Sequence, residues 1–418
     1  MMSKKFYIFP LFLLVIPIFV SFLYSFFTYD KVTTIWYYLI LYTCYFGGIY
    51  TCYYVKKHLQ RTSFTKIEKI TIGLFLFFLA SCIISTICAT SPITSLLGTS
   101  YRKEGLFTYL AYFFMIINCM FLKNNEKKKV YQLFVIVAFV LSIVSLLKIK
   151  FLMFPYQYSY NSIFCQFNHF SYFLILALVC NTCLFMFSDN RKEKIIYYIT
   201  YLILLIQLIL NNTFGGYLAL SLTTIFLCIY GVKFRKKTIS VVIILITFIA
   251  CSLFICNDKK ESIVSKNFFD NTKEVIHTNF QNEEEIAKLG TTRGKLWIGA
   301  LKMIEKKPIL GYGLDNLKEE YFDLKMYDAD KPHDFILALS AYIGIPGMLS
   351  FVLFVAIVLI ALLKQIKNLG EEEVIAYAAV VCFFCSSIFA NSMYYTTPYF
   401  CIFFGIVLSC FYRKHIKN

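Results

Sequence analysis

Residues 335–363 read FILALSAYIGIPGMLSFVLFVAIVLIALL, an apolar run without a charged side chain. A helix needs about 20 such residues to cross the hydrocarbon core of a bilayer, so this run predicts a membrane-spanning helix. Eleven further apolar runs occupy residues 6–27, 33–55, 67–89, 105–122, 130–149, 168–188, 194–211, 216–232, 239–256, 374–390 and 396–412. Of the 418 residues, 59% are hydrophobic and 16% are charged, which excludes a soluble fold. We therefore expect an all-α, polytopic integral membrane protein, with one membrane domain over residues 1–418 and about twelve transmembrane helices.

The placement of the basic residues predicts the orientation of the chain, because Lys and Arg that flank a span stay on the cytoplasmic side during insertion. The two ends of the chain and the loops expected on the same side of the membrane carry 23 of the 41 basic residues. The short loops expected on the other side carry five, and residues 258–334 carry 13. We expect both termini in the cytoplasm and one large extracytoplasmic loop, residues 258–334, between the ninth and tenth helices. The net charge of +17 indicates no nucleic-acid partner, because the basic residues do not gather on a soluble face with exposed aromatic side chains.

The 258–334 loop is expected to carry an amphipathic helix. Thr291 and Thr292 can cap a helix that begins at Arg293. Pro308 ends it, and the glycines at 311 and 313 form the turn beyond. Such a helix could lie on the bilayer surface or roof a cavity between the spans. Its apolar face comprises Leu296, Trp297, Ala300, Leu301 and Ile304.

No metal site and no other cofactor is expected. The two C-x-x-C pairs, which begin at Cys180 and Cys382, lie inside apolar runs without a nearby His or carboxylate, as is typical of buried thiols. Asp328 and Asp330 have a spacing that could hold a divalent cation, but Lys331 follows them and two carboxylates make a weak site. We interpret these residues as a solvated turn.

Polar residues that could carry chemistry lie at the expected outer membrane boundary. Arg293, in the first turn of its predicted helix, could hold a phosphate or diphosphate through its guanidinium and free backbone amides. An arginine that anchors the helix to lipid headgroups is the alternative. His333 follows Pro332 and can stay neutral near pH 7, ready to accept a proton. A structural histidine at the interface is the alternative there.

Two segments of residues 291–347 carry recognisable motifs. Residues 291–317 read TTRGKLWIGALKMIEKKPILGYGLDNL, and residues 331–347 read KPHDFILALSAYIGIPG. They resemble the O-antigen ligase and O-antigen polymerase superfamily, whose signature is an Arg, a following Trp, Pro-x-x-Gly-x-Gly, His-Asn and Gly-x-Pro-Gly. Residues 98–105 and 164–168 are similar to the family more weakly.

The resemblance implies an activity and roles for individual residues. It implies metal-independent transfer of a glycan from an undecaprenyl diphosphate carrier to an acceptor hydroxyl, at the outer face of a bacterial cytoplasmic membrane and with inversion at the anomeric carbon. His333 matches the proposed general base, and Arg293 matches the arginine proposed to bind the diphosphate. Further candidate substrate contacts are Asp334, Asn168 and Trp297.

The sequence departs from the family pattern at two places. Where many members carry Ser-Arg-Gly, this chain has Thr213, Phe214 and Gly215, so a second phosphate-binding cation is missing. Arg102 or Lys295 could replace it. Asp334 stands where the family has Asn, and its charge beside His333 is expected to raise the pKa of the histidine.

Several functions remain open. Family members act as polymerases of lipid-linked repeats, as ligases onto a lipid, or on proteins. The bias of 35 Lys over 6 Arg hints at an AT-rich genome and a single-membrane bacterium without a lipid A acceptor, which favours a polymerase. A non-enzymatic flippase of lipid-linked glycans predicts a charged central cavity and two related halves, and the sequence shows neither. A purely structural scaffold would not explain the motifs of residues 293–347.

Overall fold

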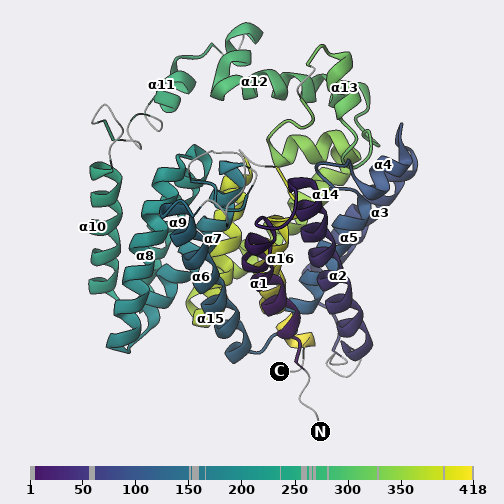
Figure 1. Ribbon diagram of the computed structural model, residues 1–418. Coiled ribbons are helices and arrows are strands. Elements are labelled where there is room, and N and C mark those ends of the chain that lie inside the picture. Colours follow the sequence, from purple (N-terminus) through teal and green to yellow (C-terminus); the bar gives the residue numbers. More distant parts are fainter. Residues whose placement is uncertain are drawn as a thin grey trace.

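The computed structural model describes residues 5–55, 62–149, 152, 160–164, 166–235, 237–255, 261–262, 266, 270–279, 282–326, 329–388 and 391–416. Within these residues the chain is helical and forms no β-strand, so the all-α prediction is confirmed. The α-helices (Figure 1) are α1 (Ile8–Leu23), α2 (Tyr29–Val55), α3 (Lys66–Ile87), α4 (Pro92–Leu97), α5 (Leu106–Cys119), α6 (Asn124–Leu146), α7 (Phe167–Phe187), α8 (Arg191–Asn211), α9 (Phe214–Arg235), α10 (Thr238–Phe254), α11 (Asp270–His277), α12 (Glu283–Lys306), α13 (Lys318–Asp323), α14 (Phe335–Lys364), α15 (Glu371–Ser387) and α16 (Thr397–Phe411).

A helix lies over each of the predicted spans. These helices are α1 to α3, α5 to α10 and α14 to α16. Among the described residues, seven helices are long and apolar enough to cross a membrane, and α1, α5, α10 and α16 are apolar but shorter. The chain is therefore a polytopic membrane protein, while the count of twelve crossings stays a prediction.

α7 and α16 lie at the centre of the bundle. The most apolar stretch of α7 is buried over its whole length, and α16 is buried from Thr397 to Cys410. Both sequences are apolar on all sides, as expected of helices that neighbours surround completely. α7 packs against α6, α8, α9 and α15, and α16 packs against α5 and α15.

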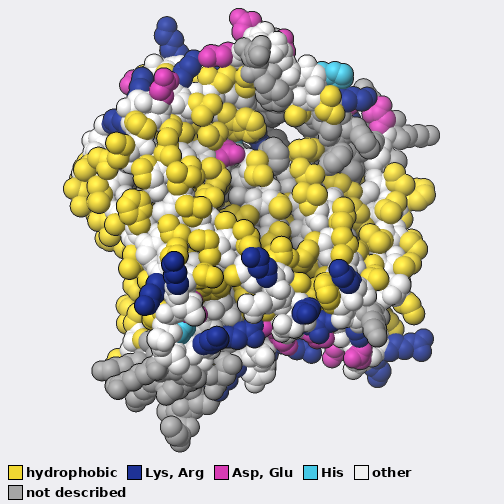
Figure 2. Space-filling view, turned by 180° about the vertical axis from the view of Figure 1, so that it is seen from behind, with side chains coloured by type: hydrophobic (Ala, Val, Ile, Leu, Met, Phe, Trp, Pro, Cys, Tyr) yellow, Lys and Arg dark blue, Asp and Glu magenta, His cyan; other side chains and the backbone are white. Residues whose placement is uncertain are grey.

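The outside of the bundle suits a lipid environment. Figure 2 shows a broad band of hydrophobic side chains with Lys and Arg along its lower edge. Phe46, Ile83, Ile199 and Ile246, from four different helices, are 43–63% exposed. Large apolar side chains in such a band are expected where hydrocarbon replaces water. Both termini lie at one end of the bundle, and α11, α12 and α13 lie at the other (Figure 1).

α14 is interrupted at Gly344, and an earlier segment fills the interruption. Gly344 has a φ of 76°, a left-handed value that glycine adopts without steric penalty. The break leaves backbone carbonyls without helical partners. The N–H groups of Tyr312 and Gly313 donate to the carbonyls of Ala341 and Tyr342, both at 2.9 Å. The segment after α12 is thus hydrogen-bonded into the broken helix.

The glycines at this junction allow close backbone contact. A Cβ atom at Gly344 would lie 2.0 Å from the carbonyl oxygen of Ile309, and one at Gly311 would lie 2.4 Å from that of Tyr342. The turn predicted at Gly311 and Gly313 is confirmed, because both have positive φ. The Pro-x-x-Gly-x-Gly and Gly-x-Pro-Gly motifs therefore pack against each other, and they fix α12 relative to the start of α14.

α12 begins earlier than predicted and is sharply bent. It starts at Glu283 rather than Arg293, because the side chain of Asn282 caps it and glutamates 283–285 favour a helix N-terminus. The Lys302 ammonium lies 3.2 Å from a carboxylate oxygen of Glu283. A straight helix would separate these residues by about 28 Å. A Cβ atom at Gly294 would lie 1.6 Å from the carbonyl oxygen of Ile286, so the bend lies between residues 286 and 294.

The predicted apolar face of α12 is correct except at one position. Ala300 and Ile304 are buried, and Leu296 and Trp297 are half-buried. Leu301 is 55% exposed, although α12 packs against α14. The helix ends at Lys306, two residues before the proline, as predicted. The side chains of the two threonines predicted as caps, at 291 and 292, lie outside the described residues.

Candidate functional site

His333 lies directly before α14, in the His333 loop (residues 329–334). It is half-buried and adopts a left-handed φ of 55°. Such a conformation is uncommon for a residue other than glycine and recurs at functional sites. Its Nδ1 atom lies 2.9 Å from the side-chain nitrogen of Asn391, which comes from the connection between α15 and α16.

Positive charges surround His333. Burial is the largest cause that lowers the pKa of His333 to about 4. The charges of Arg102 and Arg293 act in the same direction, as does that of Lys331, whereas Asp330 opposes them. The imidazole is therefore neutral at pH 7 and can accept a proton.

Asp334 has a different role from the one expected. Its carboxylate accepts a hydrogen bond from the N–H of Leu337 at 2.7 Å and caps α14. Burial raises the pKa of Asp334, and the backbone N–H groups partly oppose this. The expectation that Asp334 raises the pKa of His333 is wrong, because burial and neighbouring cations dominate and lower it.

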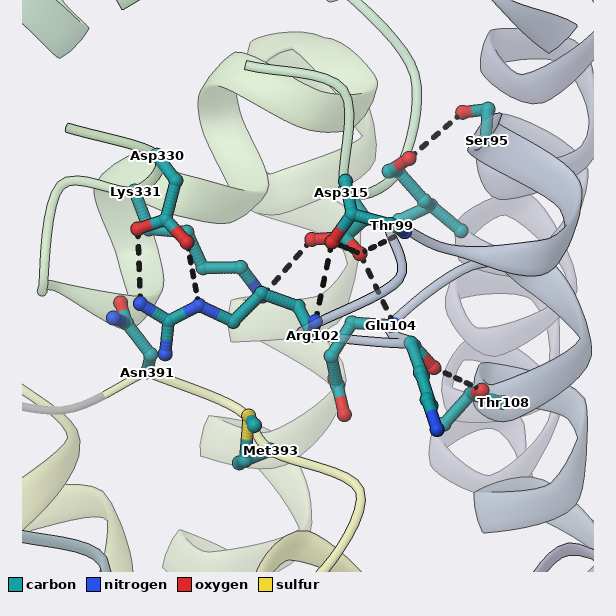
Figure 3. A network of polar contacts seen from close by, with 12 residues as sticks. Ser95, Thr99, Arg102, Glu104, Thr108, Asp315, Asp330, Lys331, Asn391 and Met393 are labelled. Atoms are coloured by element: carbon teal, nitrogen blue, oxygen red, sulfur yellow. Dashed lines mark hydrogen bonds and ion pairs between the residues drawn. The ribbon is translucent and has the colours of Figure 1, made fainter. Parts of the chain in front are cut away.

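Arg102 holds the His333 loop from another part of the chain (Figure 3). Its Nε and Nη2 atoms donate to the two carboxylate oxygens of Asp330, at 2.6 and 2.9 Å. Burial lowers the pKa of the Arg102 guanidinium, but Asp330 outweighs it and the net shift is upward. Likewise, burial raises the pKa of Asp330, and Arg102 more than reverses the effect. Both residues are therefore charged at pH 7, and two of the three guanidinium nitrogens are already in use.

A second buried ion pair lies beside the first. The ammonium of Lys331 is 3.3 Å from a carboxylate oxygen of Asp315, and both side chains are at most 2% exposed. The other oxygen of Asp315 accepts hydrogen bonds from the backbone N–H groups of Thr99 and Glu104, at 2.7 and 3.2 Å (Figure 3). The turn of residues 98–105 is thus joined to the His333 loop twice.

The interpretation of the 328–331 segment as a solvated turn is wrong for Asp330 and Lys331, because both side chains form ion pairs. Lys331 does not pair with Asp330; it is buried against Asp315, while Asp330 pairs with Arg102. Asp328 lies outside the described residues. The turn is ordered by Arg102, which is 228 positions from Asp330, and by Asp315, and local charge balance reveals neither partner.

Glu104 adds a buried carboxyl group to this network. It accepts a hydrogen bond from Tyr112, and its second oxygen has no partner among the described residues. Burial raises its pKa to about 7, although Lys331 and Tyr112 act in the opposite direction. Glu104 is therefore partly protonated at neutral pH, which lessens the number of charges buried together.

Arg293 differs from Arg102 in having a guanidinium that no described carboxylate engages. It is half-buried on α12 and close enough to His333 to lower the pKa of the imidazole. Trp297 is one turn further along the same side of the helix, and its Nε1 atom is buried without a partner among the described residues. Lys295 is exposed and lies about 200° around the helix from Arg293. The structure thus brings Arg293 and His333 together and leaves Lys295 apart from them.

α7 contributes the remaining predicted residue. Asn168 is half-buried in the first turn of α7, one turn before Tyr172, which interacts electrostatically with Arg293. Asn168 therefore lies on the side of α7 that faces Arg293. Its neighbour His169 is buried and bonds to the Tyr395 hydroxyl through Nδ1 at 2.7 Å.

Sequence reasoning missed four residues of this region: Glu104, Asp315, Lys331 and Asn391. Three of them, Glu104, Asp315 and Lys331, lie in segments that resemble the family, but the resemblance gave none of them a role. Asp315 follows the glycine turn, and Asn391 is far along the chain. Nothing in the spacing of either residue indicates that it reaches the His333 loop.

The arrangement combines a neutral base with an available cation in a half-buried position. Such a pair can accept a proton from a hydroxyl group while it stabilises a phosphate-like anion. The described residues contain no group of three or more His, Cys, Asp or Glu side chains that could hold a metal ion. Proton acceptance beside an anion is chemistry that this arrangement of residues can perform.

Comparison with known proteins identifies one family model that matches part of the chain. Residues 199–352 match the family model described as O-Antigen ligase. No curated protein matches the chain significantly. The matched segment includes Arg293, His333 and both glycine motifs, while Arg102 and Asn391 lie outside it. The family indicates a glycosyltransferase-like enzyme that handles lipid-linked glycans in surface polysaccharide biosynthesis. Residues 199–352 are therefore similar to the O-antigen ligase family.

Proposed function

We propose that the protein transfers a glycan from an undecaprenyl-diphosphate carrier to an acceptor hydroxyl, without a metal ion and with inversion, and that it thereby polymerises surface polysaccharide repeats. One observation carries the proposal. His333 is neutral at pH 7, and the unengaged guanidinium of Arg293 lies within electrostatic reach of it. A transfer of this kind needs one group that accepts the hydroxyl proton and another that neutralises the departing diphosphate.

The reaction follows as a single displacement. His333 accepts the proton of the acceptor hydroxyl, and the oxygen attacks the anomeric carbon. The bond from that carbon to the diphosphate oxygen breaks, and its electron pair leaves with the diphosphate. Arg293 stabilises the negative charge that develops there. Attack from the face opposite to the leaving group inverts the anomeric centre.

Metal independence is supported by the fact that the nearby carboxylates already have partners within the protein. Asp330 is held by Arg102, Asp315 by Lys331 and Asp334 by the N-terminus of α14. A divalent cation would have to compete with these bonds for ligands. The positive charge that a metal would bring to the diphosphate is instead supplied by Arg293, in the field of Arg102 and Lys331.

The orientation of the protein is part of the proposal. Basic residues follow the lower edge of the apolar band, and both termini lie at that end of the bundle. The positive-inside rule makes that end cytoplasmic. The site, at the opposite end with α12, then faces the outer side of the cytoplasmic membrane, where exported carrier-linked glycans are exposed.

The test uses a strain that lacks the protein, complemented with wild type, His333→Ala or Arg293→Ala. Glycan chain length and the carrier-linked intermediates on each side of the membrane are measured. His277→Ala and Lys306→Ala, exposed residues of α11 and α12, serve as matched controls. Single repeats that accumulate outside on the carrier support a polymerase. Full-length chains retained on the carrier would indicate a ligase, and repeats trapped inside would indicate a flippase and overturn the enzymatic proposal.

A further inference from the structure

Asn391 contacts the proposed base from a part of the chain that carries no recognised motif. It lies between α15 and α16, outside residues 199–352, and it is 5% exposed. Its side-chain nitrogen is 2.9 Å from Nδ1 of His333, and its side-chain oxygen is buried without a partner among the described residues. Among the same residues no protein group hydrogen-bonds to Nε2 of His333. Nε2 is therefore the nitrogen that remains for substrate.

The orientation of the Asn391 amide determines what Nε2 can do. If the amide N–H donates to Nδ1, the neutral imidazole carries its proton on Nε2, and Nε2 cannot accept another. If the amide is turned by 180°, its oxygen accepts from Nδ1–H, and Nε2 presents a lone pair. The two orientations place nitrogen and oxygen at nearly the same positions, and structures distinguish them only through the surrounding hydrogen bonds.

The second orientation, in which the amide oxygen faces Nδ1, suits His333 both before and after it accepts the proton. Once Nε2 has taken the hydroxyl proton, both imidazole nitrogens are donors, and only the amide oxygen can still bond to Nδ1–H. This oxygen also brings a partial negative charge to an imidazolium that forms among several cations. An amide orients the ring without adding the full charge of a carboxylate.

We propose that Asn391 is a positioning residue for His333, because its side-chain oxygen accepts from Nδ1–H and holds the imidazole with Nε2 free to act as the base. The inference rests on the proposed function of His333. It adds a residue that acts through the base and does not touch the reacting atoms.

The test compares Asn391→Leu with Asn391→Asp in purified full-length protein in lipid nanodiscs, with a lipid-linked glycan as donor. The Leu variant removes the acceptor, so kcat is expected to fall about 10-fold to 100-fold while the donor KM changes less than about 2-fold. The Asp variant keeps an acceptor. It is expected to retain activity and to move the acid limb of kcat/KM to higher pH, because a nearby carboxylate raises the pKa of His333. If the Leu variant does not fold, Asn391→Ala takes its place.

A measurement that does not depend on turnover separates this inference from the proposed function. Histidine is labelled with 15N, and the His333 signal among the five histidines is assigned by its loss in His333→Gln. Wild type is expected to show the Nδ1–H tautomer, and Asn391→Leu a mixture. An Nε2–H tautomer in wild type, or an Asn391→Leu variant with unchanged kcat, would overturn the positioning role. A wild-type enzyme with the Nδ1–H tautomer but no transferase activity would instead overturn the proposed function.

Discussion

The guanidinium of Arg102 binds both carboxylate oxygens of Asp330, three residues before His333. Arg102 belongs to the turn before α5, and Asp330 belongs to the His333 loop. The pair therefore joins two segments that are 228 positions apart. Because two guanidinium nitrogens are committed to this bond, the structure favours Arg102 as a residue that orders the loop, whereas its role as a diphosphate ligand stays a prediction.

A double-mutant cycle distinguishes these two roles. If the pair orders the loop, Asp330→Asn and Arg102→Gln should each lower the transfer rate about 10-fold to 100-fold, and the double variant should be no worse than either. Initial rates and donor affinity are measured in nanodiscs. If Arg102 binds the diphosphate, Arg102→Gln alone should weaken donor binding, while Asp330→Asn should leave it unchanged.

Replacement of Arg293 should change both donor binding and the titration of His333. Arg293→Gln removes a positive charge that lowers the pKa of the imidazole, so that pKa should rise. Since the protonated imidazole is inactive, the acid limb of kcat/KM should move to higher pH, together with a loss of donor affinity. Lys306→Gln, at the far end of the same helix, is the matched control. An unshifted acid limb would show that Arg293 does not act on His333.

The pH dependence should differ between the free enzyme and the donor complex. In the free enzyme the pKa of His333 is about 4, so kcat/KM should fall only below about pH 4. A bound diphosphate offsets the charges of Arg102 and Arg293, which should raise the pKa of His333 in the complex. The acid limb of kcat should therefore lie at higher pH than that of kcat/KM. Coincident limbs would argue against a diphosphate beside His333.

The membrane-spanning helices could be predicted from the sequence, because burial in lipid imposes a pattern on each helix that can be recognised locally. A helix in hydrocarbon requires an uninterrupted apolar run, so every predicted span coincides with a helix. The glycine turn after α12 was also predictable, because glycine adopts positive φ without steric penalty and both Gly311 and Gly313 do so. The start of α12 was not, because Asn282 and three glutamates cap a polar segment that has no apolar periodicity.

The ion pairs could not be predicted, because they depend on tertiary structure. From sequence, Lys331 neutralises the adjacent Asp330. In the fold, the break in α14 brings Asp315 to Lys331, and the turn before α5 brings Arg102 to Asp330. Adjacent residues in an extended loop point in different directions, so sequence neighbours take different partners.

Among the described glycines with positive φ, Gly344 has the closest neighbouring atom, so we expect it to be sensitive to substitution. An alanine there would place its Cβ 2.0 Å from the carbonyl oxygen of Ile309, in a backbone conformation with a φ of 76°. The substitution should cost at least about 3 kcal/mol and lower the melting temperature in detergent by about 5–10 °C. Gly73→Ala in α3 is the control, because a Cβ at Gly73 meets no atom within 4 Å. Since the same contact fixes α12 relative to His333, any folded Gly344→Ala protein should also lose transfer activity. A stable variant with full activity would show that the junction between the two motifs does not position the site.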